Sequence, residues 1–156
     1  MAGSPRSDFA RRRRASRLAA VQALYQMEMG GHGAKAVVRE FLDHRIGLEI
    51  DGVTLDEADP DLFRAIVEGV VGEQVLIDRT IAARLASGWK LDRIDSIVRA
   101  ILRSGVWELL RERATPAAVV IDEHVELARD FFEGPEPGLV NAILDRVAKE
   151  TGAAGA

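Results

Sequence analysis

Hydrophobic residues in this chain recur at spacings of three and four, and no stretch alternates steadily between apolar and polar positions. The first pattern places apolar side chains on one face of a helix, whereas alternation is typical of a strand. Residues 47–58 show neither pattern and are predicted to form a loop. The chain is therefore predicted to be all-α, with six to seven helices and no strand.

Signals at the helix ends set the predicted boundaries. The predicted helices cover about residues 8–29, 34–46, 59–86, 92–112, 115–132 and 137–150. Asp59 followed by Pro60 is a start signal, because aspartate caps free amides and proline favours the first helical position. Gly69 and Gly72 lie inside the third predicted helix. We attribute them to close approach of a neighbouring helix, which a side chain would block.

The predicted helices fit a single domain over residues 8–150, because the chain is of ordinary domain length. The long loop lets this domain divide into an N-terminal bundle of about 8–86 and a C-terminal bundle of about 90–150. Residues 1–7 are predicted to be a disordered basic lead, and residues 151–156 a frayed tail.

The net charge of −4 conceals a strong asymmetry along the chain. Residues 1–17 carry six arginines against one aspartate, a net charge of +5. The remainder holds 15 basic and 24 acidic residues, a net charge of −9. A basic segment on an acidic body indicates a polyanionic partner, and nucleic acid is the commonest.

Five of these arginines, Arg11, Arg12, Arg13, Arg14 and Arg17, open the first predicted helix. Arg17 lies four residues after Arg13 and three after Arg14, so these three share a helix face. Positive charge at a helix N-terminus opposes the helix dipole, so the cluster does not serve helix stability. Guanidinium groups donate hydrogen bonds in a planar fork that suits phosphate. We interpret the cluster as a polyanion site, with a solvated charge run as the alternative.

The sequence offers no recognisable catalytic constellation. It contains no cysteine, which excludes disulfides and thiolate catalysis. His32, His44 and His124 lack metal-ligand spacing, and His124 is interpreted as a core or rim residue. The stretch "GGHGAK" lacks the spacing and the hydroxyl of a phosphate-binding loop. Trp89 and Trp107 are interpreted as core residues rather than stacking platforms. We expect a protein that is not an enzyme and uses neither metal nor cofactor.

The expected location is the cytoplasm. No apolar run approaches the roughly 20 residues of a membrane span, and no apolar segment of a signal peptide follows the N-terminal charges. The acidic remainder of the chain would be repelled by an anionic membrane surface.

Several stretches together resemble the NusB family of transcription antitermination factors. They are "RRRASRLAAVQALYQME", "WKLDRIDSIVRAILRSGVWELL", "TPAAVVIDEHVELARDFF" and "LVNAILD", in that order along nearly the whole chain. The resemblance implies an all-helical fold of two small bundles. It also implies binding of a single-stranded boxA element in nascent RNA, together with the ribosomal protein that doubles as NusE. The assembly then modifies RNA polymerase so that it reads through terminators, chiefly in ribosomal RNA operons.

The resemblance assigns one set of residues to RNA contact, near the start of the first helix. It assigns a second set to the protein partner, near the end of that helix and in the middle of the chain. Arg13, Arg14 and Arg17 match the family's basic RNA-contacting positions, whereas Arg11 and Arg12 are extra or shifted basic residues. The position of Tyr25 matches a tyrosine that faces the ribosomal-protein partner. Val98 stands where some members have an acidic contact to that partner.

The resemblance also places a second RNA-contacting region in the turn before the last helix, Phe131 to Leu139. Some members have an acidic residue and a phenylalanine where this chain has Pro135 and Leu139. Leucine cannot stack on a base as phenylalanine does, so contact at this turn is expected to be weaker or to use Phe131 and backbone amides instead.

Two other functions remain open from the sequence. One is a stand-alone RNA-binding module that acts in ribosome assembly or ribosomal RNA modification. The other is a helical interaction protein whose arginines merely keep it soluble. Both a monomer and a homodimer that hides the RNA surface fit the sequence.

Overall fold

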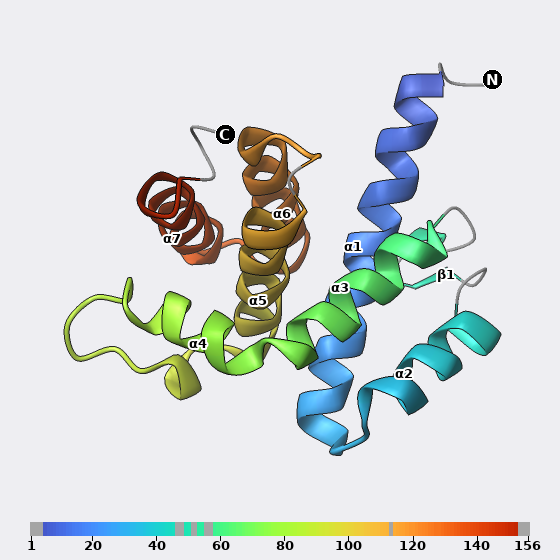
Figure 1. Cartoon of the computed structure of the whole chain (residues 1–156), viewed down its shortest axis with the longest axis horizontal. Helices are drawn as coiled ribbons and strands as arrows, with labels where there is room; N and C mark the ends of the chain where they lie inside the picture. The colour runs from blue at the N-terminus through green and yellow to red at the C-terminus, as the bar shows by residue number, and fades with distance from the viewer. Residues whose placement is uncertain (1–4, 46–48, 51–52, 55–57, 113, 153–156) are drawn as a thin grey trace. The chain divides into compact units, whose positions relative to one another are not determined.

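The computed structural model describes residues 5–45, 49–50, 53–54, 58–112 and 114–152 (Figure 1). Its helices are α1 (Pro5–Gly30), α2 (Ala34–Glu40), α3 (Pro60–Gly72), α4 (Gln74–Ala82), α5 (Ser96–Arg111), α6 (Ala117–Phe131) and α7 (Glu136–Glu150). A π-helical turn, η1 (Phe41–Arg45), continues α2, and a 3-10 turn, η3 (Leu91–Arg93), precedes α5. The predicted all-α class is confirmed.

The predicted loop contains the two short strands found in the described residues. Strands β1 (Glu49–Ile50) and β2 (Val53–Thr54) pair antiparallel, with Glu49 opposite Thr54 and Ile50 opposite Val53. The expectation of no strand was therefore wrong here. A ladder of two residue pairs is too short to leave an alternating pattern in the sequence.

The chain divides into two compact units, Met1–Val71 and Gly72–Ala156. This boundary lies inside the helix predicted over 59–86, which the structure separates into α3 and α4. Glu73 breaks the helix with a φ of −122° and a ψ of 25°. A Cβ atom at Gly72 would meet nothing within 4 Å, so the predicted close approach at Gly72 was wrong. Gly72 instead ends α3.

The ends of the chain differ modestly from their predicted limits. Helix α1 begins at Pro5, so residues 5–7 of the predicted disordered lead are helical. Residues 1–4 and 153–156 lie outside the described residues, and 151–152 form a turn after α7.

The core of the first unit joins α1, α2, η1 and α3. Phe41 and Phe63 are fully buried, and their rings stack with centroids 5.5 Å apart. Offset or stacked aromatic pairs of this kind add stability beyond the apolar area they bury. The cap predicted for α3 is confirmed, because Asp59 Oδ1 accepts a hydrogen bond from the amide of Asp61 at 2.9 Å.

Helix α5 is the centre of the second unit and packs against α4, α6 and α7. Its wide apolar arc predicts such a position. A Cβ atom at Gly105 would lie 2.8 Å from a methyl carbon of Leu144, so glycine allows α5 and α7 to approach closely here. The close helix contact expected at a glycine thus occurs at a different position.

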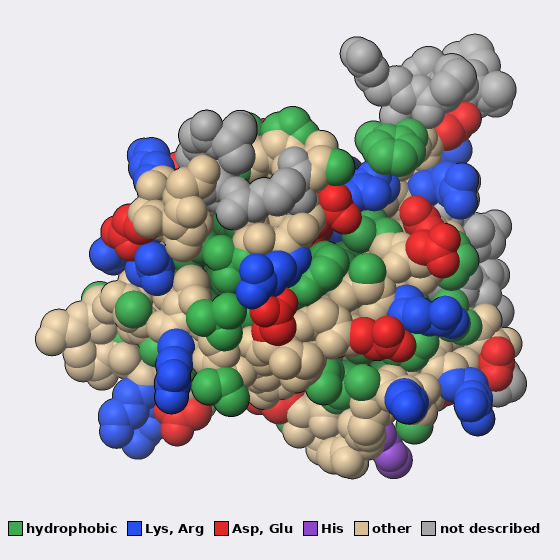
Figure 2. Space-filling model, in the orientation of Figure 1, with side chains coloured by type: hydrophobic (Ala, Val, Ile, Leu, Met, Phe, Trp, Pro, Cys, Tyr) green, Lys and Arg blue, Asp and Glu red, His purple; other side chains and the backbone are tan. Residues whose placement is uncertain are grey.

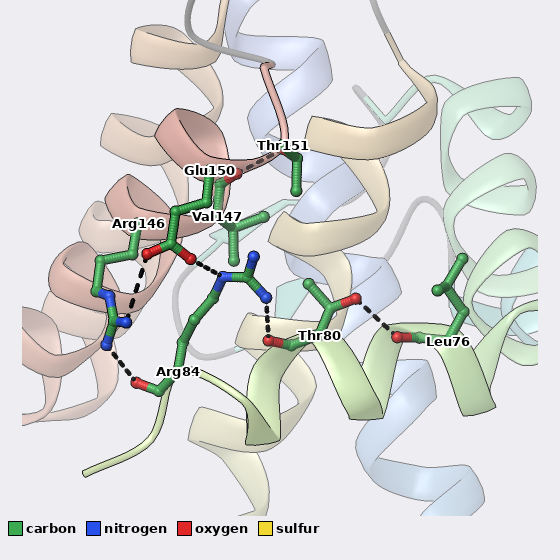
Figure 3. A network of polar contacts seen from close by, with 7 residues as sticks. All are labelled: Leu76, Thr80, Arg84, Arg146, Val147, Glu150 and Thr151. Atoms are coloured by element: carbon green, nitrogen blue, oxygen red, sulfur yellow. Dashed lines mark hydrogen bonds and ion pairs between the residues drawn. The ribbon is translucent and has the colours of Figure 1, made fainter.

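A polar network ties the end of α4 to the end of α7 (Figure 3). Arg84 Nε forms an ion pair with Glu150 Oε2 at 2.8 Å, and Arg84 Nη1 donates to the carbonyl of Thr80 at 2.9 Å. Arg146 donates to the carbonyl of Arg84 at 3.3 Å. These contacts fix the point from which the chain leaves α4 toward η3.

Glu73 and Arg111 form a second link, between the start of α4 and the end of α5. Arg111 Nε donates to both carboxylate oxygens of Glu73, at 3.0 and 2.9 Å. Hydrogen bonding to Arg111 holds the pKa of Glu73 below its ordinary value. A group whose pKa is lowered by folding stabilises the fold above its unfolded pKa, and this stabilisation disappears as the pH falls through the folded pKa.

We therefore predict that Glu73→Gln lowers the free energy of unfolding at neutral pH and loses this effect in acid. Urea unfolding of both proteins from about pH 7 to about pH 2 measures the difference. Adding Arg111→Gln to Glu73→Gln should cost little more at neutral pH, because the partner is already gone. A difference that stays constant with pH would show that the carboxylate charge is not responsible.

Candidate nucleic-acid interface

Helix α1 has two parts with opposite environments. From Ala15 to Leu24 nearly every side chain is buried, whereas from Phe9 to Arg14 the side chains are exposed or, for Arg13, half-buried. The change occurs within one turn of the helix. The basic residues therefore lie on the part of α1 that the protein leaves accessible.

The arginines at this end of α1 form a cluster on the surface, which we call the arginine cluster: Arg11, Arg12, Arg13 and Arg14. Figure 2 shows basic side chains together with an exposed hydrophobic side chain near this end of the helix. Arg11 pairs with Asp8 at 3.1 Å, and both side chains are well exposed. An exposed pair of this kind contributes little stability, so a ligand can replace it cheaply.

Arg17 does not belong to this surface. Its side chain is only 2% exposed, so it presents no area to a ligand in this structure. Helical spacing places Arg17 on the same face as Arg13 and Arg14, but this face enters the core after Ala15. Direct RNA contact by Arg17 therefore does not fit its burial, and we assign it to the core of the first unit.

Ser16 anchors the buried part of α1. Its hydroxyl donates to the carbonyls of Arg12 at 2.9 Å and Asp59 at 3.0 Å, and it accepts from the Asp59 amide at 2.7 Å. Asp59 caps α3, so one hydroxyl joins the end of the arginine cluster to the start of α3. This contact fixes where the exposed part of α1 begins.

The second unit contains an apolar pocket of about 470 Å³. It brings together Val98, predicted to contact a protein partner, with Pro135 and Leu139, predicted to contact RNA. Trp89 and Ile94 complete its apolar lining, and the acidic residues Asp95 and Glu136 also line it. We call this the Trp89 pocket.

Trp89 is 60% exposed, so its interpretation as a core residue was wrong. The residue lies between α4 and η3, after Gly88 with a φ of +87°, rather than on a helix. Interruption of the helical pattern at Ser87-Gly88 is the sequence signal that could have revealed it. An exposed tryptophan in an apolar pocket is a common anchor for a binding partner.

Arg99 fixes the backbone around the pocket residue Ile94. Its Nη1 donates to the carbonyls of Leu91 at 3.1 Å and Ile94 at 2.5 Å. Burial lowers the pKa of Arg99, and its side chain satisfies carbonyls at the turn into α5. Asp95 caps the same helix by accepting from the amide of Ile97 at 2.8 Å.

The remaining predicted site residues lie elsewhere. Phe131 is half-buried beside Phe132, with ring centroids 6.5 Å apart, and does not line the Trp89 pocket. Tyr25 is half-buried on α1 in the first unit, whereas Val98 is buried on α5 in the second.

Histidines make no catalytic or metal site in the described residues. The predicted core position of His124 is confirmed, since it is fully buried, with Nε2 2.9 Å from Ser104 Oγ and Nδ1 2.8 Å from the Val120 carbonyl. His32 is exposed, and the side chain of His44 lies outside the described residues. No cluster of three potential metal ligands occurs where the structure is described. None of its described helices is long and apolar enough to cross a membrane.

A model of the NusB family matches residues 14–149, from within the arginine cluster to the end of α7. The chain belongs to the NusB family. Transcription antitermination protein NusB of Rhizobium etli strain CIAT 652 is 56% identical over 141 residues, 90% of this chain and 88% of that protein. The protein of the same name from Agrobacterium fabrum is 52% identical over 151 residues, 95% of this chain and 92% of that protein.

Solved NusB structures share the fold. T. maritima NusB matches with a TM-score of 0.74 and 31% identity, covering 88% of this chain and 91% of that chain. A chain from a crystal structure of antitermination factors NusB and NusE in complex with dsRNA has a TM-score of 0.74 at 22% identity, covering 90% and 98%. The relatives are named as transcription antitermination proteins, which confirms the expectation of a non-enzymatic protein.

We predict that Ser16→Ala destabilises this NusB-family chain by about 1 kcal/mol or more, because it leaves the part-buried amide of Asp59 without its acceptor. Thermal and urea unfolding measure the loss. Ser87→Ala, at an exposed position after α4, is the matched control and should change stability by less than about 0.5 kcal/mol. Equal stability of the two variants would show that the Ser16 hydroxyl is not an anchor.

Proposed function

We propose that this chain is a cytoplasmic transcription antitermination factor that binds boxA-type single-stranded RNA together with the ribosomal protein NusE. Within an assembly on RNA polymerase it promotes read-through of terminators, chiefly in ribosomal RNA operons. The observation that carries this proposal is the arginine cluster, exposed at the start of α1 on a chain that is acidic overall. Membership of the NusB family supports it.

RNA is proposed to lie across the arginine cluster. Four guanidinium groups repel one another when the surface is empty, and this repulsion is relieved when phosphates lie between them. If the strand contacts all four, the logarithm of the affinity should fall with the logarithm of salt concentration at a slope of roughly −3. Phosphate contacts of this kind position a strand without reading its sequence.

NusE is proposed to use the Trp89 pocket. Apolar walls from Trp89, Val98 and Leu139 suit an apolar side chain, while Asp95 and Glu136 favour a partner with basic residues. Val98 replaces the acidic contact of some family members, but these two carboxylates still supply negative charge close by. A basic ribosomal protein fits both requirements.

RNA contact at the turn before α7 remains part of the proposal in a restricted form. Carboxylates at Asp95 and Glu136 repel phosphate, so a strand reaching Pro135 or Leu139 is expected to present a base rather than its backbone. Phe131, half-buried at the end of α6, is an aromatic side chain in this region that a base could contact.

The test is a titration of labelled boxA RNA with and without NusE, using wild-type protein and the double variant Arg13→Ala, Arg14→Ala. We expect NusE to tighten binding of boxA RNA more than that of scrambled RNA. The double variant should lose about tenfold or more in affinity and flatten the salt slope by about 1 to 2. Its thermal midpoint should be unchanged.

Other outcomes of this titration identify the competing functions. Equal affinity for boxA and scrambled RNA with no effect of NusE would favour a stand-alone RNA-binding module. No binding even at low salt would favour a helical interaction protein. Unfolding of the double variant would show that the arginines serve the fold.

We predict that Trp89→Ala weakens NusE binding by about tenfold or more, because truncating a tryptophan anchor typically costs at least about 2 kcal/mol. Calorimetry of the protein with NusE, without RNA, measures this change. Val119→Ala removes a side chain that is 44% exposed on α6 and is absent from the pocket lining. It is the matched control and should bind NusE normally, whereas equal binding by both variants would exclude the pocket.

A further inference from the structure

Phe9 is an exposed aromatic side chain among the arginines of α1. It is 60% exposed, although a phenylalanine normally contributes to folding by being buried. It precedes the arginine cluster by two residues and lies outside the segment that the family model matches. A fold-stabilising role therefore does not account for it.

Arg13 positions the Phe9 ring. The two residues are four apart on α1, and the guanidinium carbon of Arg13 lies 5.3 Å from the ring centroid. This is the range of a cation–π interaction, and residues four apart on a helix share a face. Arg12 is three residues from Phe9 and belongs to the same side of the helix. An aromatic plane and positive charges are thus held together on one surface.

The charges around Phe9 select the kind of molecule that it can contact. A basic protein such as the proposed partner of the Trp89 pocket would be repelled by the four arginines. Single-stranded nucleic acid offers the required combination, since each nucleotide carries a flat base and an anionic phosphate. Proteins that bind single strands combine aromatic stacking platforms with basic grooves in the same way.

We propose that Phe9 is a stacking platform for an unpaired base of the RNA strand whose phosphates contact the arginine cluster. This proposal rests on the proposed RNA-binding function and adds a contact that charge alone does not supply. Every base has a π-face, so stacking on Phe9 increases affinity with little choice of sequence. It does distinguish single strands from duplexes, because a paired base is already stacked between its neighbours.

The experiment compares Phe9→Ala and Phe9→Trp with wild-type protein, using boxA RNA as a single strand and as a duplex with its complement. Phe9→Ala should weaken single-strand binding by roughly 5- to 150-fold and leave duplex binding within about twofold. Phe9→Trp should bind the single strand at least as tightly as wild-type protein. The salt slope should stay the same in both variants, since the phosphate contacts remain.

Met29→Ala provides the matched control, because Met29 is 57% exposed at the other end of the same helix. It should bind both RNAs like wild-type protein, and thermal unfolding should show that all three variants are folded. Unchanged single-strand binding by Phe9→Ala would overturn the stacking proposal. Equal losses on single strand and duplex, or failure of Phe9→Trp to bind, would overturn it as well.

These outcomes are distinct from failure of the proposed function. If Phe9→Ala binds normally while Arg13→Ala with Arg14→Ala loses RNA, the function stands and only the stacking contact is wrong. If wild-type protein fails to bind boxA RNA at low salt with or without NusE, the proposed function is wrong and the stacking contact with it.

Discussion

The hydroxyl of Ser16 is the contact on which the interface of the first unit depends. It accepts from the Asp59 amide, and its single proton is shared between the carbonyls of Asp59 and Arg12, all within 3.0 Å, while Ser16 itself is fully buried. The contact sets the depth to which α1 enters the core. One turn earlier the arginine cluster is exposed, and one residue later Arg17 is buried. A single fixed point thus separates the buried part of α1 from the exposed part that is proposed to meet a ligand.

The division of α1 into a buried and an exposed part allows for an arginine cluster that is unfavourable by itself. Neighbouring arginines of like charge repel one another. Stability therefore does not explain the cluster, whereas the proposed anionic ligand would. The pair between Arg11 and Asp8 relieves part of the repulsion on a surface that a ligand can still reach.

Sequence reasoning succeeded where one local interaction decides the structure. Asp59 caps α3 as predicted, and the broad apolar arc of α5 marked the central helix. Sequence reasoning failed where the spacing of residues along a helix was the only signal. The apolar residues of α3 and α4 share one helical spacing, so the sequence predicts a single helix through Glu73. The backbone nevertheless breaks at Glu73, and the two helices belong to different units. Helical spacing also grouped Arg17 with Arg13, since periodicity gives a face and not the depth at which that face enters the core.

The two candidate surfaces carry side chains of opposite charge, so the phosphates of RNA and the basic residues of a protein partner are expected to prefer different surfaces. A phosphate chain is drawn to the arginine cluster and repelled by Asp95 and Glu136 at the Trp89 pocket, while a basic protein experiences the reverse. Each also has an exposed aromatic residue, Phe9 or Trp89, at 60% exposure. Each aromatic residue would add a contact that charge cannot give. Phe9 is proposed to stack on a base, and Trp89 is proposed to contact an apolar side chain of the protein partner. In the two proposed interactions, repulsion of the wrong partner would contribute to specificity as much as attraction of the right one.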